Sequence, residues 1–572
     1  MTRPQLWAPG ARRVELETGG RRHAMRALEG GWHEAKLDLL PGTDYRFWAG
    51  GPRPLPDPRS AWQPEGVHGP SRTVDHGAFA WQDRAWTGFP LSAAVIYELH
   101  VGTFTPAGTF EGAIERLDHV AALGANAVEL MPVAEFPGRR GWGYDGVDLY
   151  APHHAYGGPE GLKRLVDACH ARGLAVVLDV VYNHLGPDGN HLEGLGPYFS
   201  DRHTTPWGRA VNFDGPGSRG VRDFVIENAL GWLRDHHLDG VRLDAVHAIH
   251  DASAVHVLEE LSGRVRELEA HLGRQLWVIA ESDLNDPRVV TPREAGGLGC
   301  DAQWSDDFHH ALHALLTGER TGYYGDFGTM EDLATALRQA YVYDGRESPY
   351  RRRSHGRPPR GLSGHRFLAY TQNHDQVGNR ALGERSSALM SQGRLRVAAA
   401  LLCASPFVPM LFQGEEWGAC TPFLYFTDHR APALARAVRR GRAGEVEALG
   451  AGSRVPDPQA RATFERSRLD WEEPAREPHR GLLEWHRLLL ALRRELPELA
   501  DGALDRVRVR YDERARWLVL ERGRVTVACN LGPREARPAV SADAVLAGSC
   551  EGVRLRAARA VLPPDSVGVF GS

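Results

Sequence analysis

The spacing of hydrophobic residues changes twice along this chain. Up to about residue 88, short alternating runs such as AKLDLLPGTDYRFWAGG (35–51) are separated by turns, which predicts a small β-sandwich. From about residue 90, short apolar runs alternate with segments of helical spacing. After about residue 500 the period-two alternation returns, and WLVLERGRVTVACNL (517–531) predicts a hairpin with its turn at Arg522-Gly523. The pattern predicts three domains, at residues 1–88, 89–499 and 500–572.

The central region contains eight apolar runs that are typical of buried parallel strands. Most of them are separated by a segment with helical spacing, such as PEGLKRLVDACHARG (159–173), and Thr109 and Gly124 mark the ends of another helix. Eight strands with mainly helical crossovers favour a closed (β/α)₈ TIM barrel over an open, doubly wound sheet. The predicted strands lie within residues 95–101, 126–133, 174–184, 240–249, 276–283, 301–310, 365–375 and 407–417.

Composition narrows the range of functions. A net charge of −5 over 572 residues, with 25% charged residues, predicts neither a nucleic-acid partner nor a membrane surface. The six cysteines are scattered without a CxxC pair, which suits neither a disulfide framework nor a zinc site. The first residues lack the apolar core of a signal peptide, and no apolar run is long enough for a bilayer. We therefore expect a cytoplasmic protein.

The run GVRLDAVHAI (240–249) places Arg242 and Asp244 on one face of a predicted internal strand. Burial of each ion would cost several kcal/mol, on the order of the folding stability itself. Taken alone, this pair could equally be a structural ion pair. Three other strand ends, DVVYNH (179–184), AESD (280–283) and QNHD (372–375), carry similar polar clusters. Because strand ends in a barrel converge on one mouth, the four clusters together predict an active site.

These four segments resemble the signature regions of the α-amylase superfamily, glycoside hydrolase family 13, whose members are retaining hydrolases and transferases. The resemblance implies that Asp244 is the nucleophile, Glu281 the general acid/base and Asp375 the stabiliser of the transition state. It also implies sugar-binding or supporting roles for Arg242, His184 and His374. The reaction itself requires such a pair of carboxyl groups, since cleavage of a glycosidic bond with retention needs one carboxyl as acid and one carboxylate as nucleophile.

Three longer segments, 98–110, 129–170 and 301–313, resemble the superfamily members that hydrolyse the α-1,4 bond next to the terminal trehalose of maltooligosyltrehalose. The resemblance implies a carbohydrate-binding type of N-terminal sandwich, and Tyr144 as a stacking surface for the sugar. It implies maltooligosyltrehalose and related α-glucans as substrates, and a maltooligosyltrehalose synthase as pathway partner. The substrate-binding residues that we predict are Tyr144, Asp145, His184, Arg242, His247, Asp306, Asp307, His309, His374, Gln376 and Asn379.

Two alternatives remain open at this point. A 1,4-α-glucan branching enzyme would use the same covalent intermediate but pass the sugar to another glucan. A catalytically silent glucan-binding scaffold would lack a catalytic carboxylate, and all three are present. We expect no required metal and no cofactor. The arginine-rich segment RRRSHGRPPR (351–360) is expected to be a solvated loop, or to cover one end of the sugar cleft.

Overall fold

The computed structural model describes residues 1–448 and 455–572. At its centre, eight parallel strands form a closed barrel in the order β12-β15-β16-β17-β20-β21-β8-β9. The fold prediction is confirmed, and each of the eight predicted runs contains one strand. The strands are β8 (Ile96–Leu99), β9 (Ala127–Leu130), β12 (Ala175–Val180), β15 (Gly240–Leu243), β16 (Trp277–Ala280), β17 (Ala302–Trp304), β20 (Phe367–Tyr370) and β21 (Val408–Phe412).

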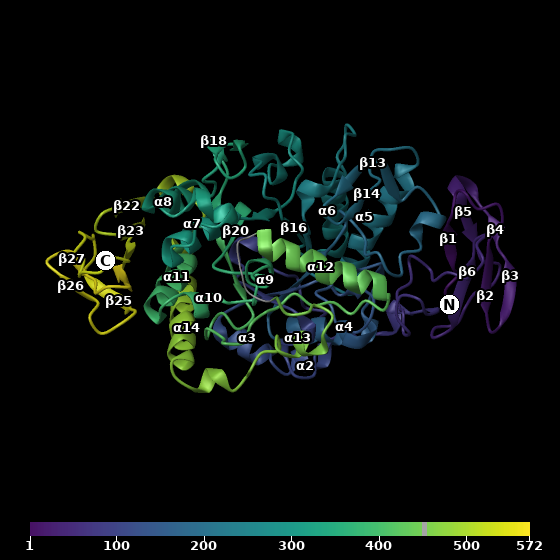
Figure 1. Cartoon of the computed structure of the whole chain (residues 1–572), viewed down its shortest axis with the longest axis horizontal. Helices are drawn as coiled ribbons and strands as arrows, with labels where there is room; N and C mark the ends of the chain where they lie inside the picture. The colour runs from purple at the N-terminus through teal and green to yellow at the C-terminus, as the bar shows by residue number, and fades with distance from the viewer. Residues whose placement is uncertain (449–454) are drawn as a thin grey trace.

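Helices surround the barrel and connect most of its strands (Figure 1). Between β16 and β17 the connection consists only of the short 3₁₀ turns η7 (Pro287–Val289) and η8 (Arg293–Ala295). The helices of the barrel region are α1 (Val101–Phe104), α2 (Phe110–Ile114), α3 (Leu117–Leu123), α4 (Gly158–His170), α5 (Ser218–Asp235), α6 (Val257–Leu272), α7 (Asp306–Thr317), α8 (Met330–Gln339), α9 (His374–Gly378), α10 (Ser386–Leu389), α11 (Gln392–Ala404), α12 (Pro432–Ala448), α13 (Arg461–Glu465), α14 (His479–Glu495) and α15 (Pro497–Ala500).

The segment 301–310, predicted as one strand, is the clearest difference from the sequence analysis. Strand β17 ends at Trp304, and α7 begins at Asp306, so the whole DDFHH motif is helical. Two acidic residues in the first turn favour a helix start through the helix dipole. Phe308, Leu312 and Leu315 then recur at helical spacing and are buried. The prediction that 301–310 forms one strand was therefore wrong beyond Trp304.

The predicted end signals of the first barrel helix are observed. Thr109 caps α2 by accepting a hydrogen bond from the backbone N–H of Gly112 at 3.1 Å. Gly124 ends α3 in the left-handed conformation, with φ 105°. Between these signals the helix is broken at Glu115 and Arg116, so one predicted helix is two shorter ones.

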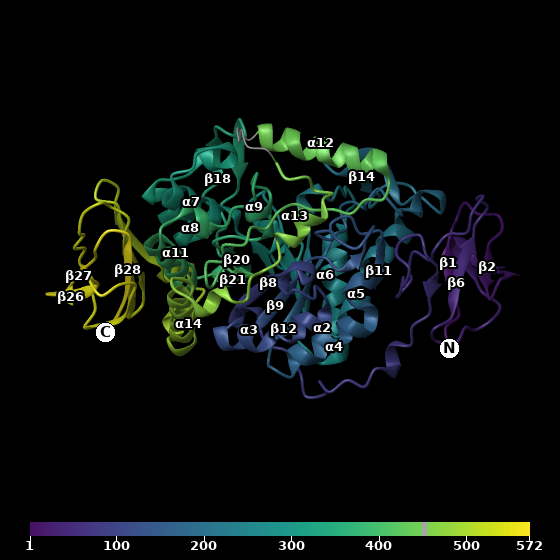
Figure 2. The same ribbon diagram turned by 60° about the horizontal axis from the view of Figure 1, so that its bottom comes forward.

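One β-domain lies on either side of the barrel region (Figure 2). The N-terminal one consists of the sheets β1-β5-β4 and β3-β2-β6-β7, formed by β1 (Gln5–Trp7), β2 (Glu15–Thr18), β3 (Arg21–Ala24), β4 (Arg26–Ala27), β5 (Trp32–Glu34), β6 (Asp44–Trp48) and β7 (Ser71–Arg72). Its Trp7 packs edge-on against Tyr198 of the barrel region, with ring centroids 5.2 Å apart.

The C-terminal domain has a five-stranded sheet in the order β22-β23-β24-β28-β25. The predicted hairpin is present as β23 (Trp517–Arg522) and β24 (Val525–Asn530), joined at Gly523. The other strands are β22 (Arg508–Asp512), β25 (Ala544–Gly548), β26 (Arg554–Arg556), β27 (Arg559–Val561) and β28 (Ser566–Gly571). We propose domain boundaries near residues 88 and 499, since β7 ends at Arg72 and β22 begins at Arg508. Among the described residues, no helix combines the length and the apolar content that crossing a membrane requires.

The start of α4 depends on a glycine that touches the N-terminal segment. Gly158 has φ +61°, and a Cβ there would lie 1.8 Å from Cζ3 of Trp62. We expect Gly158→Ala to lower the melting temperature measured by calorimetry, because the ring must move and a packed interface is lost. Gly173→Ala is the matched control, with φ +72° and no atom within 4 Å of the added Cβ. Equal losses in the two variants would contradict the packing argument.

Candidate active site

A cavity of about 730 Å³ opens at the carboxyl ends of the barrel strands. The predicted residues that line it are Tyr144, Asp145, His184, Asp244, His247, Glu281, Asp375 and Asn379. Helix α12 contributes Val438, Gly441, Arg442 and Glu445 to the wall, and Figure 1 shows this helix lying across the barrel. The structure therefore brings all three predicted catalytic carboxylates to one cavity.

Sheet register brings Asp244 and Glu281 together. Leu243 of β15 pairs with Ala280 of β16, so the two acidic residues follow at the same level on neighbouring strands. Neighbouring strands are roughly 4.7–4.9 Å apart. That spacing is close to the roughly 5–5.5 Å between the two carboxyl groups of a retaining glycosidase.

Both carboxylates also bind the same guanidinium group. Arg242 is fully buried, and its two terminal nitrogens lie 2.9 Å from Asp244 Oδ1 and 2.9 Å from Glu281 Oε2. The first of these nitrogens also donates to both carboxylate oxygens of Asp179, each at 2.7 Å. The guanidinium lies 4.1 Å from the ring centroid of Trp304, which adds a cation–π contact. The charged residues of GVRLDAVHAI therefore belong to one ion cluster below the cavity.

Asn183 holds the second oxygen of Asp244. Its side-chain amide donates to Asp244 Oδ2 at 2.7 Å and to the backbone carbonyl of Asp244 at 2.9 Å. Its amide oxygen is hydrogen-bonded to the imidazole of His184. With Arg242 on the first oxygen and Asn183 on the second, the carboxylate has a fixed orientation. Asn183 was absent from the predicted site, although it lies within the DVVYNH motif.

A hydrogen bond from the strained backbone at Ala245 fixes the side chain of Glu281. Ala245 has the left-handed conformation, with φ +41°, which is uncommon for a residue with a Cβ. This turn lets the backbone N–H of Ala245 donate to Glu281 Oε2 at 2.8 Å. Strain of this kind tends to occur at functional sites, where the surrounding structure holds it in place.

A chain of hydrogen bonds joins Asp375 to the Arg242 cluster. His374 donates from Nδ1 to Glu98, and from Nε2 to the Tyr144 hydroxyl at 2.7 Å. Tyr144 then donates to Asp179 Oδ2 at 2.5 Å. The ring of Tyr144 also stacks on His374, so only its other face is free for a sugar. Asp375 Oδ2 lies 3.5 Å from His374 Nε2.

Three groups along these hydrogen bonds have shifted pKa values, and burial raises that of the Tyr144 hydroxyl. Burial alone would lower the pKa of His374, but the negative charges of Asp375 and Glu98 outweigh it and raise the pKa to about 9. The imidazole is therefore a cation at neutral pH, as its two donated hydrogen bonds require. Burial raises the pKa of the Asp179 carboxyl to about 7, with Arg242 acting in the opposite direction.

Asp306 lies next to the cavity but is not part of its lining. It accepts a hydrogen bond from the Tyr370 hydroxyl, and burial with the nearby Glu281 raises its pKa to about 7. Gln376 is also outside the lining, and its side-chain oxygen accepts from the hydroxyl of Tyr323 at 3.1 Å. Because Tyr323 lines the cavity, Gln376 acts on the wall through that ring.

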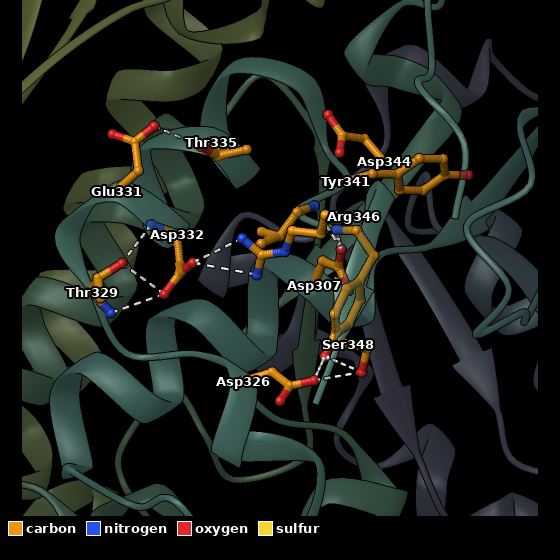
Figure 3. Close-up of polar contacts among 12 residues, drawn as sticks. Asp307, Asp326, Thr329, Glu331, Asp332, Thr335, Tyr341, Asp344, Arg346 and Ser348 are labelled. Carbon is orange, nitrogen blue, oxygen red and sulfur yellow. Dashed lines mark hydrogen bonds and ion pairs between the residues drawn. The ribbon is translucent and has the colours of Figure 1, made fainter. Parts of the chain in front are cut away.

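Asp307 and His309 lie farther from the cavity than we predicted. Asp307 accepts from the backbone N–H groups of Val342 at 2.6 Å and Tyr343 at 2.8 Å, so it fixes the chain after α8. Figure 3 shows it beside Arg346, within a separate group of polar residues. His309 is buried and contacts the Thr371 carbonyl at 2.9 Å. The helical geometry of DDFHH turns both side chains away from the strand end.

Sequence reasoning missed most of the aromatic wall of the cavity. Trp207 lies between β13 (Phe199–Thr205) and β14 (Gly208–Val211), a hairpin inserted after β12, and its ring stacks on His184 with centroids 5.3 Å apart. Its side chain remains half exposed in the cavity. The other aromatic residues of the wall are Trp142, Tyr323 and Tyr425. Trp142 lies two residues before Tyr144, within segment 129–170, but was not predicted as a contact. No motif marks Trp207, Tyr323 or Tyr425; an isolated tryptophan in a polar hairpin is the only signal.

The arginine-rich segment 351–360 contacts one residue of the cavity wall. Arg351 forms an ion pair of 3.0 Å with Asp283, a residue of the cavity wall. Residues Arg353–Gly356 form strand β19, which pairs with β18 (Asp344–Ser348). The segment is thus partly ordered as a hairpin, and its first arginine is paired with a carboxylate of the cavity wall.

Comparison with known proteins fits this geometry. Residues 75–195 match the α-amylase catalytic domain family, and residues 502–569 match a domain of unknown function, DUF3459. The malto-oligosyltrehalose trehalohydrolase of Arthrobacter ramosus is 53% identical over 92% of this chain and 93% of its own length. That of Saccharolobus solfataricus is 46% identical over 86% of this chain and 84% of its own length. This chain belongs to the malto-oligosyltrehalose trehalohydrolase family.

The trehalohydrolase family lies within the α-amylase superfamily, so the chain is a glycoside hydrolase of that superfamily. A 1,4-alpha-glucan branching enzyme of Bordetella pertussis is more distant, with 32% identity over 73% of this chain and 60% of its own length. A solved structure of a putative alpha amylase from Salmonella typhimurium superimposes with a TM-score of 0.92, at 39% identity over 99% of this chain and 97% of that chain. An Anoxybacillus pullulanase, at 18% identity and a TM-score of 0.74, covers 100% of this chain and 86% of its own and shares the fold.

The charge on His374 predicts how this trehalohydrolase-family site depends on pH. We expect kcat/KM to fall as the pH rises through about 9, because the neutral imidazole loses one of its two donated hydrogen bonds. The same raised pKa contributes stability that is full below about 6.5 and is lost as the pH rises through about 9. Glu98→Gln removes one anionic partner and should move the alkaline limb to lower pH by about one unit.

The measurement is a pH–rate profile of the wild type and the variant. Glu111→Gln, with a side chain 66% exposed, serves as the control and should leave the limb in place. An alkaline limb at the same pH in all three proteins would contradict the role of the Glu98–His374 pair.

Proposed function

We propose that this protein hydrolyses the α-1,4-glucosidic bond next to the terminal trehalose unit of maltooligosyltrehalose, with retention of configuration. The observation that carries the reaction type is the pair Asp244 and Glu281, held on neighbouring strands by one buried arginine. The substrate follows from family membership, since the relatives that match nearly the whole chain are named malto-oligosyltrehalose trehalohydrolases.

In the first step, Asp244 would attack the anomeric carbon while Glu281 protonates the glycosidic oxygen. The carbon–oxygen bond to trehalose breaks, trehalose leaves, and the maltooligosyl group stays covalently bound to Asp244. Arg242 and Asn183 support this role because they stabilise the ionised carboxylate and fix both of its oxygens.

In the second step, Glu281 would take a proton from water, and the water oxygen would displace Asp244 from the anomeric carbon. Two inversions at that carbon give net retention. The released products are trehalose and a maltooligosaccharide shortened by the trehalose unit.

Asp375 would act on the sugar hydroxyls next to the reacting carbon, since it lines the same cavity and is anchored by the His374 cation. The free face of Tyr144 would stack on the C–H face of the pyranose at the cleavage site. Among the other predicted substrate contacts, Asp145, His184, His247 and Asn379 also line this cavity. Four other predicted residues would act indirectly, by positioning their neighbours: Arg242, His374, Asp306 and Gln376.

The proposed substrate requires a second enzyme in the same compartment. Maltooligosyltrehalose ends in a trehalose unit, so an enzyme that converts the reducing end of a maltooligosaccharide, a maltooligosyltrehalose synthase, must precede this one. We propose a cytoplasmic location for the pair, because the six cysteines, Cys169, Cys300, Cys403, Cys420, Cys529 and Cys550, are all free thiols, as a reducing compartment favours.

Product analysis tests the substrate. We expect incubation with maltooligosyltrehalose to release trehalose and the α-anomer of the shortened oligosaccharide, measured by chromatography and by proton NMR before mutarotation. Linear amylose in parallel is the control for branching activity, because a branching enzyme transfers the intermediate to a glucan hydroxyl. Branched glucan without trehalose would reject the proposal in favour of the more distant branching-enzyme relative.

Two variants separate the roles of the carboxylates. Asp244→Asn should lower kcat by about 10⁴-fold or more on every substrate, because no covalent intermediate forms. Glu281→Gln should be nearly inactive on maltooligosyltrehalose yet give a burst of fluoride from an α-maltosyl fluoride, because fluoride leaves without protonation.

Rapid-mixing measurements with a fluoride electrode detect that burst. Asp118→Asn, at an 83% exposed carboxylate, is the control and should behave as the wild type. A fluoride burst from Asp244→Asn, or equal losses of Glu281→Gln on both substrates, would show that the two roles are wrongly assigned.

A further inference from the structure

A cysteine, a glutamate and a histidine meet outside the catalytic cavity. Cys420 lies in the loop after β21, Glu473 in η11 (Glu473–Ala475), and His479 at the first position of α14. One ligand atom of each lies within 4.8 Å of the others. Cys420 is exposed and the other two are partly exposed, so the group is open to solvent. The proposed catalysis uses none of these three groups.

The orientation of His479 is that of a metal ligand. Its Nδ1 donates to the backbone carbonyl of Trp417 at 2.9 Å, since a carbonyl oxygen can only accept. In the neutral imidazole, Nε2 then carries the free lone pair, and it points to Cys420 Sγ at 3.8 Å. Tetrahedral zinc, with bonds of roughly 2.3 Å to sulfur and 2.0 Å to nitrogen, separates these two atoms by about 3.5 Å. The observed pair needs only a small adjustment to reach that distance.

Glu473 is held by the same tryptophan. The indole N–H of Trp417 donates to Glu473 Oε2 at 3.0 Å, and the backbone N–H of Cys420 donates to Oε1 at 3.2 Å. A carboxylate has about four lone-pair sites, so Oε1 retains one for a further partner. Partners of this kind, which orient the ligands of a metal, are a general feature of metal sites. Trp417 is fully buried and so provides a rigid support for both residues.

We infer that Cys420, Glu473 and His479 form a binding site for a divalent transition-metal ion, with zinc as the best-matched ion. The combination of thiolate, imidazole and carboxylate suits zinc and excludes magnesium and calcium, which prefer oxygen ligands. The thiolate and carboxylate balance the two positive charges of the ion. Three protein ligands leave the fourth tetrahedral position to water.

A second group of potential ligands, Glu135, His153 and His154, does not meet the same test. Nδ1 of His153 accepts a hydrogen bond from the backbone N–H of Ala155 at 3.1 Å, so its proton lies on Nε2. That is the nitrogen that faces Glu135, at 3.7 Å, and a protonated nitrogen cannot bind a metal. His154 already donates to the same carboxylate at 2.7 Å.

The position of the site links it to the catalytic cavity without contact with the reacting atoms. The loop that carries Cys420 continues to Tyr425, Thr427 and His429, all of which line the cavity wall. A bound ion would tie the beginning of this loop to α14. It would therefore raise the thermal stability and restrict the loop, while hydrolysis itself proceeds without the ion.

Cobalt(II) is a spectroscopic probe for this site. The full-length protein, freed of metal by a chelator, would be titrated with cobalt chloride and its absorption recorded. We expect one equivalent to produce a near-ultraviolet thiolate-to-cobalt band, and zinc to displace it. Cys420→Ser should abolish the band, and His479→Gln should weaken binding at least tenfold. Cys550→Ser, at the other exposed thiol, is the matched control and should retain it.

Alkylation of the wild type provides a second measurement that needs no variant. Zinc should slow the reaction of Cys420 with iodoacetamide at least tenfold while leaving that of Cys550 unchanged, as read by peptide mass spectrometry. Absence of the cobalt band in the wild type, or its persistence in Cys420→Ser, would overturn the proposal. So would equal alkylation of Cys420 with and without zinc, which would indicate an ordinary hydrogen-bonded cluster.

Discussion

The buried guanidinium of Arg242 is the constraint on which the active site depends. An ion without solvent costs several kcal/mol, and this one is stable only because Asp179, Asp244 and Glu281 surround it. The three partners come from three strands: Asp179 lies in β12, Asp244 follows β15 and Glu281 follows β16. The position of one positive charge thereby fixes the separation of the two carboxylates that would carry out the reaction.

Further buried ion pairs and hydrogen bonds continue from this cluster around the barrel mouth. One hydrogen-bonded chain joins Glu98 of β8, His374 at the start of α9, Tyr144 in the loop after β9 and Asp179 of β12, and it ends at Arg242. In a low dielectric, removal of any member leaves a buried charge without its partner. The chain of hydrogen bonds therefore keeps the proposed catalytic groups rigid, while Trp207 and helix α12 contribute to the wall of the cavity.

The sequence by itself determined the barrel and the chemical centre. Parallel strands buried on both faces are nearly continuous apolar runs, so all eight could be located, and polar residues at their ends stood out against that background. Asp244, Glu281 and Asp375 lie on the cavity because strand ends in a closed barrel always meet at one mouth. Local signals such as the Thr109 cap and the hairpin around Gly523 were equally visible, because they depend only on near neighbours.

The tertiary structure alone decided which polar residues reach the cavity and which support it. Asp307 and His309 follow a strand in the sequence, but a helix begins at Asp306 and rotates them away. Asn183, Trp207 and Trp417 acquire their positions from partners such as Asp244, His184 and His479, which lie tens of residues away, and no local pattern carries that information. The spacing of hydrophobic residues along a strand indicates which of its faces is buried. The partners of a side chain depend instead on how separate segments pack together. That is why the reaction type could be predicted from the sequence and the wall of the cleft could not.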